Sequence, residues 1–199
     1  MASISPVRIT GNWSIGYALD LHTLSSTLIG HDDAGRAQFD TQRSELGQLV
    51  YDIKYSGRLD AATDIIETAY SFIIKNYITP PTLSFNVVVP VPPSTHRAHQ
   101  PVFIIADGIA KKFNVLCSYC ISCSSTSQIK NIHDKEERDK ELSIKYVIND
   151  GVLKGMSVLL IDDLYRSGST LNTIANIVLQ SGGAARVDVI TITKTRSNR

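Results

Sequence analysis

One stretch of the chain carries most of the residues that are suited to chemistry. Residues 158–171 read VLLIDDLYRSGSTL, an apolar run followed by Asp162, Asp163 and a turn of small and hydroxyl-bearing residues. The pattern predicts a buried strand that ends at the two aspartates, a loop at 164–170 and a helix from Leu171. A helix that begins after such a turn presents free backbone N–H groups and the positive end of its dipole, and together these bind phosphate.

The residues of the turn add to this phosphate site. Ser167, Ser169 and Thr170 supply hydroxyl donors, and Gly168 lets the backbone approach a ligand closely. Carboxylates beside a phosphate repel it unless they contact sugar hydroxyls or a divalent cation. The residue types therefore predict a phosphorylated sugar, with the two aspartates on its ribose hydroxyls or on Mg²⁺. The simpler alternative is an ordinary helix entry with an acidic cap.

Two other phosphate-binding classes are excluded because their motifs are absent. The chain contains no GxxxxGK[ST], so it is not a P-loop NTPase, and no GxGxxG, so a dinucleotide site is not supported. The cysteines Cys117, Cys120 and Cys123 lack an evident fourth ligand and would point to different faces of a strand. We expect them to be small buried residues rather than a zinc site.

The composition excludes several classes of protein and of partner. Of 199 residues, 43% are hydrophobic and 20% are charged, which is typical of a globular domain. The 20 Lys and Arg residues against 19 Asp and Glu give a net charge of +1, so the chain has no bulk attraction for nucleic acids or anionic lipids. No apolar stretch is long enough to span a membrane, and the N-terminus lacks a secretory signal pattern. We expect a cytoplasmic protein with no membrane partner.

Strands that alternate with helices position these residues. The periodicity predicts helices at 44–58, 59–77, 102–113 and 171–179, and strands at 84–91, 114–123, 144–148, 158–161 and 187–192. This order predicts an α/β fold with a mostly parallel twisted sheet flanked by helices. We divide the chain into a helical N-terminal appendage at 1–82 and a core at 83–199. Ligands of such sheets bind at the carboxyl ends of the strands, where the aspartates lie.

The segment LLI-DD-L-YR-SGST resembles the signature of the type I phosphoribosyltransferases. That signature combines an apolar strand, two acidic residues, an apolar residue, two variable residues and [ST]-G-x-T, and this chain matches every defined position. Within the superfamily, the closer likeness is to the ComF-like group associated with DNA uptake. It depends on YDIKYSGR (51–58), VVVPVPPS (87–94) and SQIKNIHDKEER (127–138), and it covers about residues 44–195. The cysteine zinc module that often begins ComF-like proteins is missing.

The resemblance implies an enzyme that binds 5-phosphoribosyl 1-pyrophosphate (PRPP) with Mg²⁺. Such an enzyme transfers the phosphoribosyl group to an acceptor and releases pyrophosphate. The resemblance assigns Asp162 and Asp163 to catalysis, on the ribose hydroxyls or on Mg²⁺. It assigns the 5-phosphate to the loop residues Arg166, Ser167, Gly168, Ser169 and Thr170.

The resemblance also implies two further elements. A loop at 94–100 holds the pyrophosphate through Ser94 and Arg97. The polar excursion at 124–142 lies where the family has its mobile lid, and it brings the cations of Lys130, Lys135 and Arg138 over the pyrophosphate.

The sequence leaves a second function open. The loop at 94–100 is shorter than in ComF-like proteins and lacks their Arg-Gly-Phe-Asn stretch. The same pocket would then bind PRPP or a related nucleotide without turnover, in a regulatory or partner protein connected with DNA uptake or defence. The acceptor is not predicted. Dimers are common among the enzymes that the chain resembles, so a homodimer is one of the assemblies to test.

Overall fold

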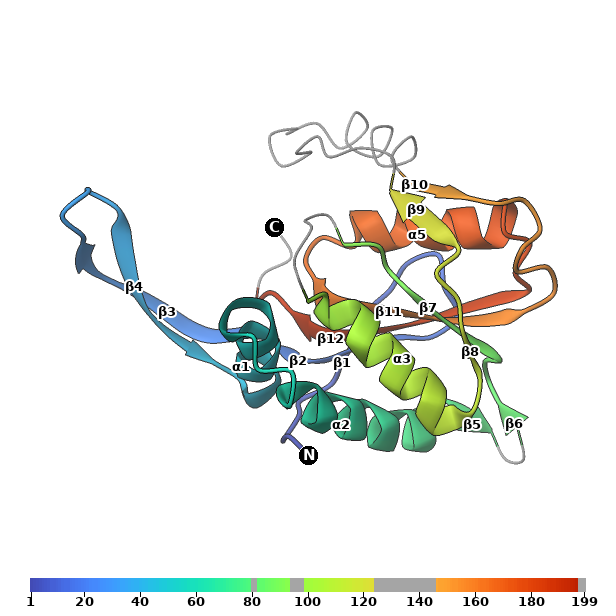
Figure 1. The fold of residues 1–199 in the computed structure, drawn as a ribbon, viewed down its shortest axis with the longest axis horizontal. Coiled ribbons are helices and arrows are strands. Elements are labelled where there is room, and N and C mark those ends of the chain that lie inside the picture. The colour runs from blue at the N-terminus through green and yellow to red at the C-terminus, as the bar shows by residue number, and fades with distance from the viewer. Residues whose placement is uncertain (80–81, 94–98, 124–145, 197–199) are drawn as a thin grey trace.

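The computed structural model describes residues 1–79, 82–93, 99–123 and 146–196 (Figure 1). Among these residues, the largest sheet has six strands in the order β1-β2-β12-β11-β7-β8. Their bounds are β1 (Val7–Arg8), β2 (Gly16–Leu21), β12 (Arg186–Lys194), β11 (Ser157–Tyr165), β7 (Val87–Pro90) and β8 (Leu116–Cys117). All neighbours pair in parallel except β1, which is antiparallel to β2. The predicted mostly parallel α/β sheet is confirmed.

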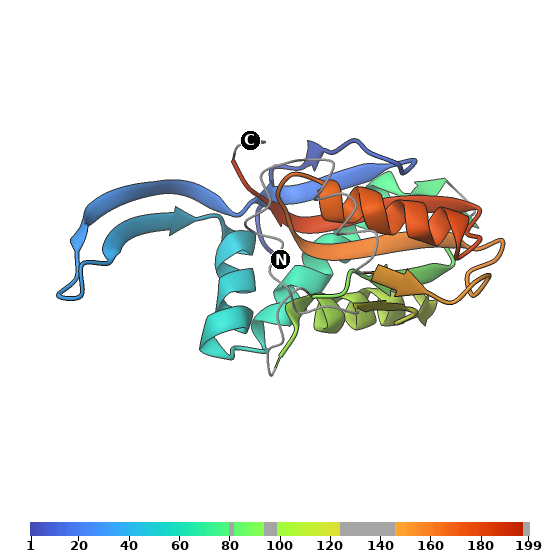
Figure 2. The same cartoon turned by 90° about the horizontal axis from the view of Figure 1, so that it is seen from above.

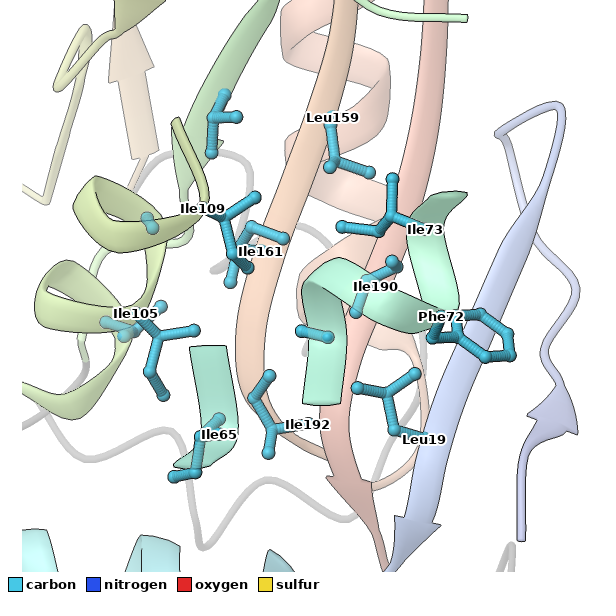
Figure 3. Packing of buried hydrophobic residues seen from close by; sticks show 14 of the residues in the cluster. Leu19, Ile65, Phe72, Ile73, Ile105, Ile109, Leu159, Ile161, Ile190 and Ile192 are labelled. Carbon is cyan, nitrogen blue, oxygen red and sulfur yellow. The ribbon is translucent and has the colours of Figure 1, made fainter. Parts of the chain in front are cut away.

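Helices cover both faces of this sheet (Figure 2). One face carries α1 (Glu45–Tyr51), α2 (Ala61–Asn76) and α3 (Pro101–Phe113), and the other face carries α5 (Ser169–Gln180). Because side chains alternate along a strand, each strand serves two apolar cores. On β11, Leu159 and Ile161 belong to the core under α1 to α3, which Figure 3 shows from close by. Val158 and Leu160 belong to the core under α5.

The described residues also form three two-stranded sheets. These pair β3 (Thr23–His31) with β4 (Ala37–Arg43), β5 (Ile78–Thr79) with β6 (Thr82–Leu83), and β9 (Ile121–Cys123) with β10 (Tyr146–Ile148). The β3–β4 hairpin projects from the body of the molecule (Figure 1). Most of its side chains are exposed, including the cross-strand pair Leu28 and Phe39.

Two predicted elements are each divided into two segments in the structure. The strand expected at 114–123 was wrong as one element, because β8 and β9 are separate strands in different sheets. The backbone leaves the main sheet after Ser118, whose N–H donates to the carbonyl of Val88 at 2.9 Å. The helix expected at 44–58 ends at Tyr51 and continues as a π-helical turn, η1 (Asp52–Ser56), which stops at Gly57 with φ +67°.

The N-terminal 43 residues, which gave no clear sequence pattern, belong largely to strands. β2 pairs in parallel with β12 from Val189↔Gly16 to Lys194↔Leu21, so it is part of the main sheet. The two helices expected before residue 82 are present as α1 and α2. We expected a division between 1–82 and 83–199, but both segments contribute to one sheet and to the same apolar core.

Helix α1 is fastened to the end of β2. The Oγ of Ser44 accepts a hydrogen bond from the N–H of Gly47 at 3.0 Å and donates to the carbonyl of Leu21. Gly47 lies so close to His22 that an added Cβ would overlap the carbonyl oxygen of His22. The lack of a side chain at Gly47 therefore sets the position of α1 and η1 at the carboxyl edge of the sheet.

We predict that Gly47→Ala destabilises the protein, although alanine is normally the better helix former. The overlap with the His22 carbonyl should lower the free energy of unfolding by about 1–3 kcal/mol. Urea denaturation measures this. Thr63→Ala at an exposed position of α2 is the control and should change stability by less than about 0.5 kcal/mol. A Gly47→Ala variant as stable as the wild type would contradict the close contact.

Candidate functional site

Asp162 and Asp163 lie near the carboxyl end of β11, as predicted, but the strand does not end there. Its pairing with β12 continues through Leu164 and Tyr165, which lie opposite Thr193 and Lys194. The predicted strand end at residue 161 and the long loop at 164–170 were therefore wrong. The connection to α5 is the three-residue segment Arg166–Gly168, because the ladder with β12 holds the backbone extended beyond the aspartates.

The two carboxylates point to opposite faces of the sheet. Asp163 follows Ile161 in the alternation, toward α1 to α3, and its Oδ2 lies 2.9 Å from the Nζ of Lys54 in η1. Asp162 follows Leu160, toward α5, and its Oδ1 accepts a hydrogen bond from the Asp163 N–H at 2.8 Å. Burial foremost, and then the charge of Asp163, raise the pKa of Asp162 well above its usual range.

This arrangement does not fit a Mg²⁺ ion held directly by both aspartates. Mg²⁺ requires convergent oxygen ligands, whereas these carboxylates diverge and one of them already pairs with Lys54. In the described part of the chain, no group of three or more His, Cys, Asp or Glu residues is placed to hold a metal. Cys117, Cys120 and Cys123 are half-buried and form no disulfide. The aspartates are better suited to accept hydrogen bonds from a ligand.

Lys54 belongs to the site and was not predicted from the sequence. Its side chain is 12% exposed and that of Asp163 is 18% exposed, so the ion pair is largely shielded from water. The turn that carries Lys54 is braced by Asp52, which accepts hydrogen bonds from Gln48 Nε2 at 2.7 Å and from Arg58 Nη1 at 2.9 Å. The only sequence signal was the motif YDIKYSGR, which contributed to the resemblance without indicating a role.

His22 and Thr193 also lie at this edge and were not predicted. The Oγ1 of Thr193 donates to the carbonyl of Asp163 at 2.9 Å, so it accepts from Nδ1 of His22, 3.1 Å away. Burial foremost, and then the charges of Lys54 and Arg43, lower the pKa of His22, while Asp163 opposes this shift. We therefore assign a neutral ring with its hydrogen on Nδ1 and a lone pair on Nε2.

The predicted phosphate loop is placed at the start of α5. Gly168 has φ +81°, and an added Cβ would lie 2.7 Å from the hydroxyl of Tyr165, so this turn requires glycine. Within the described residues, no side chain caps the N-terminus of α5. The Oγ atoms of Ser167 and Ser169 lie 3.3 Å apart, and Arg166 is exposed. The turn thus brings N–H groups, hydroxyls and one guanidinium together.

Five predicted site residues lie outside the described part of the chain. They are the pyrophosphate candidates Ser94 and Arg97 and the lid candidates Lys130, Lys135 and Arg138. The described strand that leads to the first two is β7, which ends at Pro90 opposite Ile161 of β11. Residues 91–93, which follow β7, therefore lie at the same edge of the sheet as the aspartates.

A hollow of about 330 Å³ lies elsewhere on the molecule. Its lining includes Trp13, Leu179, Arg186 and Val187. Because β12 begins at Arg186, this hollow lies at the opposite edge of the sheet from the aspartates and is not part of the candidate site. The described helices include none that is long and apolar enough to cross a membrane.

Comparison with solved structures identifies the class of fold. The chain is similar to glutamine PRPP amidotransferase from B. subtilis, with a TM-score of 0.50 and 18% identity over 80% of this chain and 34% of that one. It is equally similar to an allosteric regulatory enzyme of purine biosynthesis, with a TM-score of 0.50 and 16% identity over 88% of this chain and 44% of that one. The chain therefore has a type I phosphoribosyltransferase fold.

Comparison of sequences is more specific. No family model matches the chain. It is 26% identical over 115 residues to the competence protein ComFC of Bacillus subtilis (strain 168), which covers 55% of this chain and 45% of the relative. The chain thus matches less than half of the length of ComFC. The resemblance to ComF-like type I phosphoribosyltransferases is confirmed.

We predict that Asp162 makes stability depend on pH. Its raised pKa means that the native state keeps a proton that the unfolded chain releases above about pH 4, so the free energy of unfolding falls as pH rises toward neutrality. The asparagine of Asp162→Asn does not ionise. The free energy of unfolding of this variant, relative to that of the wild type, should therefore rise by about 1–2 kcal/mol between pH 4 and pH 8. Urea denaturation across this range measures the difference. Exposed Asp40→Asn is the control, and equal slopes for Asp162→Asn and the wild type would contradict the assignment.

Proposed function

We propose that the chain binds PRPP at the carboxyl edge of its main sheet. The observation that supports this most strongly is the succession of two features along the chain. The two aspartates near the end of β11 are followed by the N-terminus of α5, which no side chain of the described residues caps. In this proposal the loop Arg166–Thr170 holds the 5-phosphate through N–H groups and hydroxyls. Asp162 and Asp163 accept hydrogen bonds from the ribose hydroxyls. Together these contacts orient the sugar across the end of β11.

The proposed reaction is transfer of the phosphoribosyl group. The bond between the anomeric carbon and the pyrophosphate oxygen breaks, and pyrophosphate leaves with the electron pair. The acceptor forms a new bond to the same carbon and loses a proton. The chain's contribution is mainly position and electrostatics, because the transition state is a sugar cation. Mg²⁺ accompanies the pyrophosphate of the substrate in this proposal, since the described residues do not fit a directly held ion.

The remaining assignments follow from the same proposal. Ser94 and Arg97 clamp the pyrophosphate, and Lys130, Lys135 and Arg138 approach it from the lid. The acceptor is unidentified, and a cytoplasmic location and a homodimer are part of the proposal. A second candidate is a protein that binds PRPP or a nucleotide without turnover. The similarity to a competence protein favours this candidate.

We predict that PRPP binding depends on the start of α5. Titration calorimetry with PRPP and Mg²⁺ should show binding to the wild type and a loss of about tenfold or more in Gly168→Ala, because the added methyl group distorts the turn. Arg166→Ala should also weaken binding, since it removes a charge-assisted contact with the phosphate. Arg36→Ala is the charge-matched control on the exposed hairpin and should bind as the wild type does.

Two results separate the candidate functions. Release of pyrophosphate with any nucleobase, nucleoside or amine supports the transferase. Binding of PRPP without release in any of these mixtures supports the non-catalytic protein. A wild-type chain that binds neither PRPP nor a nucleotide contradicts both candidates.

A further inference from the structure

Asp163 is held at three of its four polar atoms. Its N–H donates to Asp162 Oδ1 at 2.8 Å, its carbonyl accepts from Thr193 Oγ1 at 2.9 Å, and its Oδ2 pairs with Lys54 Nζ at 2.9 Å. Among the described residues, the fourth atom, Oδ1, has no hydrogen-bond partner. It is not one of the buried polar atoms that lack a partner, so it is open to solvent. Asp163 therefore has one fixed orientation and one accepting oxygen that remains for a ligand.

The position of Lys54 is as well determined as that of Asp163. Lys54 belongs to a π-helical turn that begins where α1 ends and stops at Gly57, and such turns are frequent at functional sites. The turn follows α1, which the contacts of Ser44 and Gly47 fasten to the end of β2. Lys54 thus reaches Asp163 from a segment about 110 positions earlier in the chain. These contacts distinguish Lys54 from a surface lysine whose side chain is free to move.

We propose that Lys54 is a positioning residue that holds Asp163 so that its Oδ1 accepts a hydrogen bond from a ribose hydroxyl. The inference rests on the proposed function, and it adds the part of the site that selects ribose over a deoxy sugar. Lys54 does this from the segment that we expected to be an appendage. Its ammonium group serves Asp163 as the fixed positive partner that a directly bound divalent cation would otherwise provide.

Charge near the pair favours this role over direct binding of phosphate by Lys54. A lysine that is 12% exposed and 2.9 Å from a carboxylate has its charge largely compensated. Arg43 is the other cation that lowers the pKa of His22. Its guanidinium also has a partner, because it lies 3.9 Å from the centre of the Tyr51 ring. Asp163 Oδ2 pairs with Lys54 at 2.9 Å, and a carboxylate accepts a hydrogen bond from a hydroxyl more strongly than a neutral group does.

The test measures the affinity of three probes that need no divalent cation. Ribose 5-phosphate, 2-deoxyribose 5-phosphate and 3-deoxyribose 5-phosphate are titrated into the full chain in the presence of EDTA. The wild type should bind ribose 5-phosphate about tenfold more tightly than at least one of the deoxy sugars, because a hydrogen bond to an ionised group is lost. In Lys54→Met this ratio should fall to about one, with affinity for the deoxy sugars unchanged.

Two variants control for other effects of the substitution. Lys54→Arg keeps a cation beside Asp163 and should retain the wild-type preference for ribose. Lys112→Met removes a lysine from the remote Lys112–Glu67 ion pair and should also retain it. If Lys54→Met is too unstable to measure, because it leaves Asp163 without its partner, the double variant Lys54→Met/Asp163→Asn replaces it. The double variant should bind all three sugars with equal affinity.

The outcomes distinguish the inference from the proposed function. A wild type that binds ribose 5-phosphate without preferring it to either deoxy sugar overturns the role of Lys54 and leaves the phosphate site intact. The same conclusion follows if Lys54→Met, or the double variant, still prefers ribose. A wild type that binds PRPP with Mg²⁺ but none of the three sugar phosphates overturns the inference alone. A wild type that binds neither PRPP nor any of the sugar phosphates overturns the proposed function and the inference with it.

Discussion

The contact between α1 and the end of β2 is the constraint on which the candidate site depends. Ser44 bonds to Leu21, and Gly47 lies against the carbonyl of His22, so the helix has one position at the sheet edge. The π-helical turn after it then delivers Lys54 to Asp163. Without this contact the edge would hold two aspartates and a phosphate loop but not the ammonium group of Lys54.

The charges that act at this edge of the sheet come from a few nearby groups and not from the net charge of the chain. The whole chain carries a net charge of +1, which attracts no polyanion, yet the edge gathers Lys54, Arg43 and the N-terminus of α5 around two carboxylates. The sheet separates the carboxylates, because neighbours on a strand face opposite sides. As a result, Asp163 is compensated by a lysine, whereas Asp162 is half-buried and has a raised pKa. Two residues of one type thereby acquire different properties.

The sequence predicted the half of the site that is contiguous in the chain. The strand, acidic pair, glycine turn and helix at 158–180 carry local signals, namely apolar alternation and small residues, and all four are present. Lys54, His22 and Thr193 carry no such signal, because only the pairing of β2 with β12 and the docking of α1 bring them together. β2 itself was missed, since its six residues mix buried Asp20 with apolar neighbours. The direction of each aspartate depended on where β11 ends, which the ladder with β12 decides.

The β3–β4 hairpin has a consequence for how this fold can vary. It leaves the body at Thr23 and returns at Arg43, and these two residues are paired with each other. Because both ends are fixed, one by β2 and the other by α1, the length of the hairpin is independent of the sheet and of the site. Residues 24–42 therefore form an insertion point. The chain can lengthen, shorten or carry additional structure there while the spacing between His22 and Ser44 stays the same.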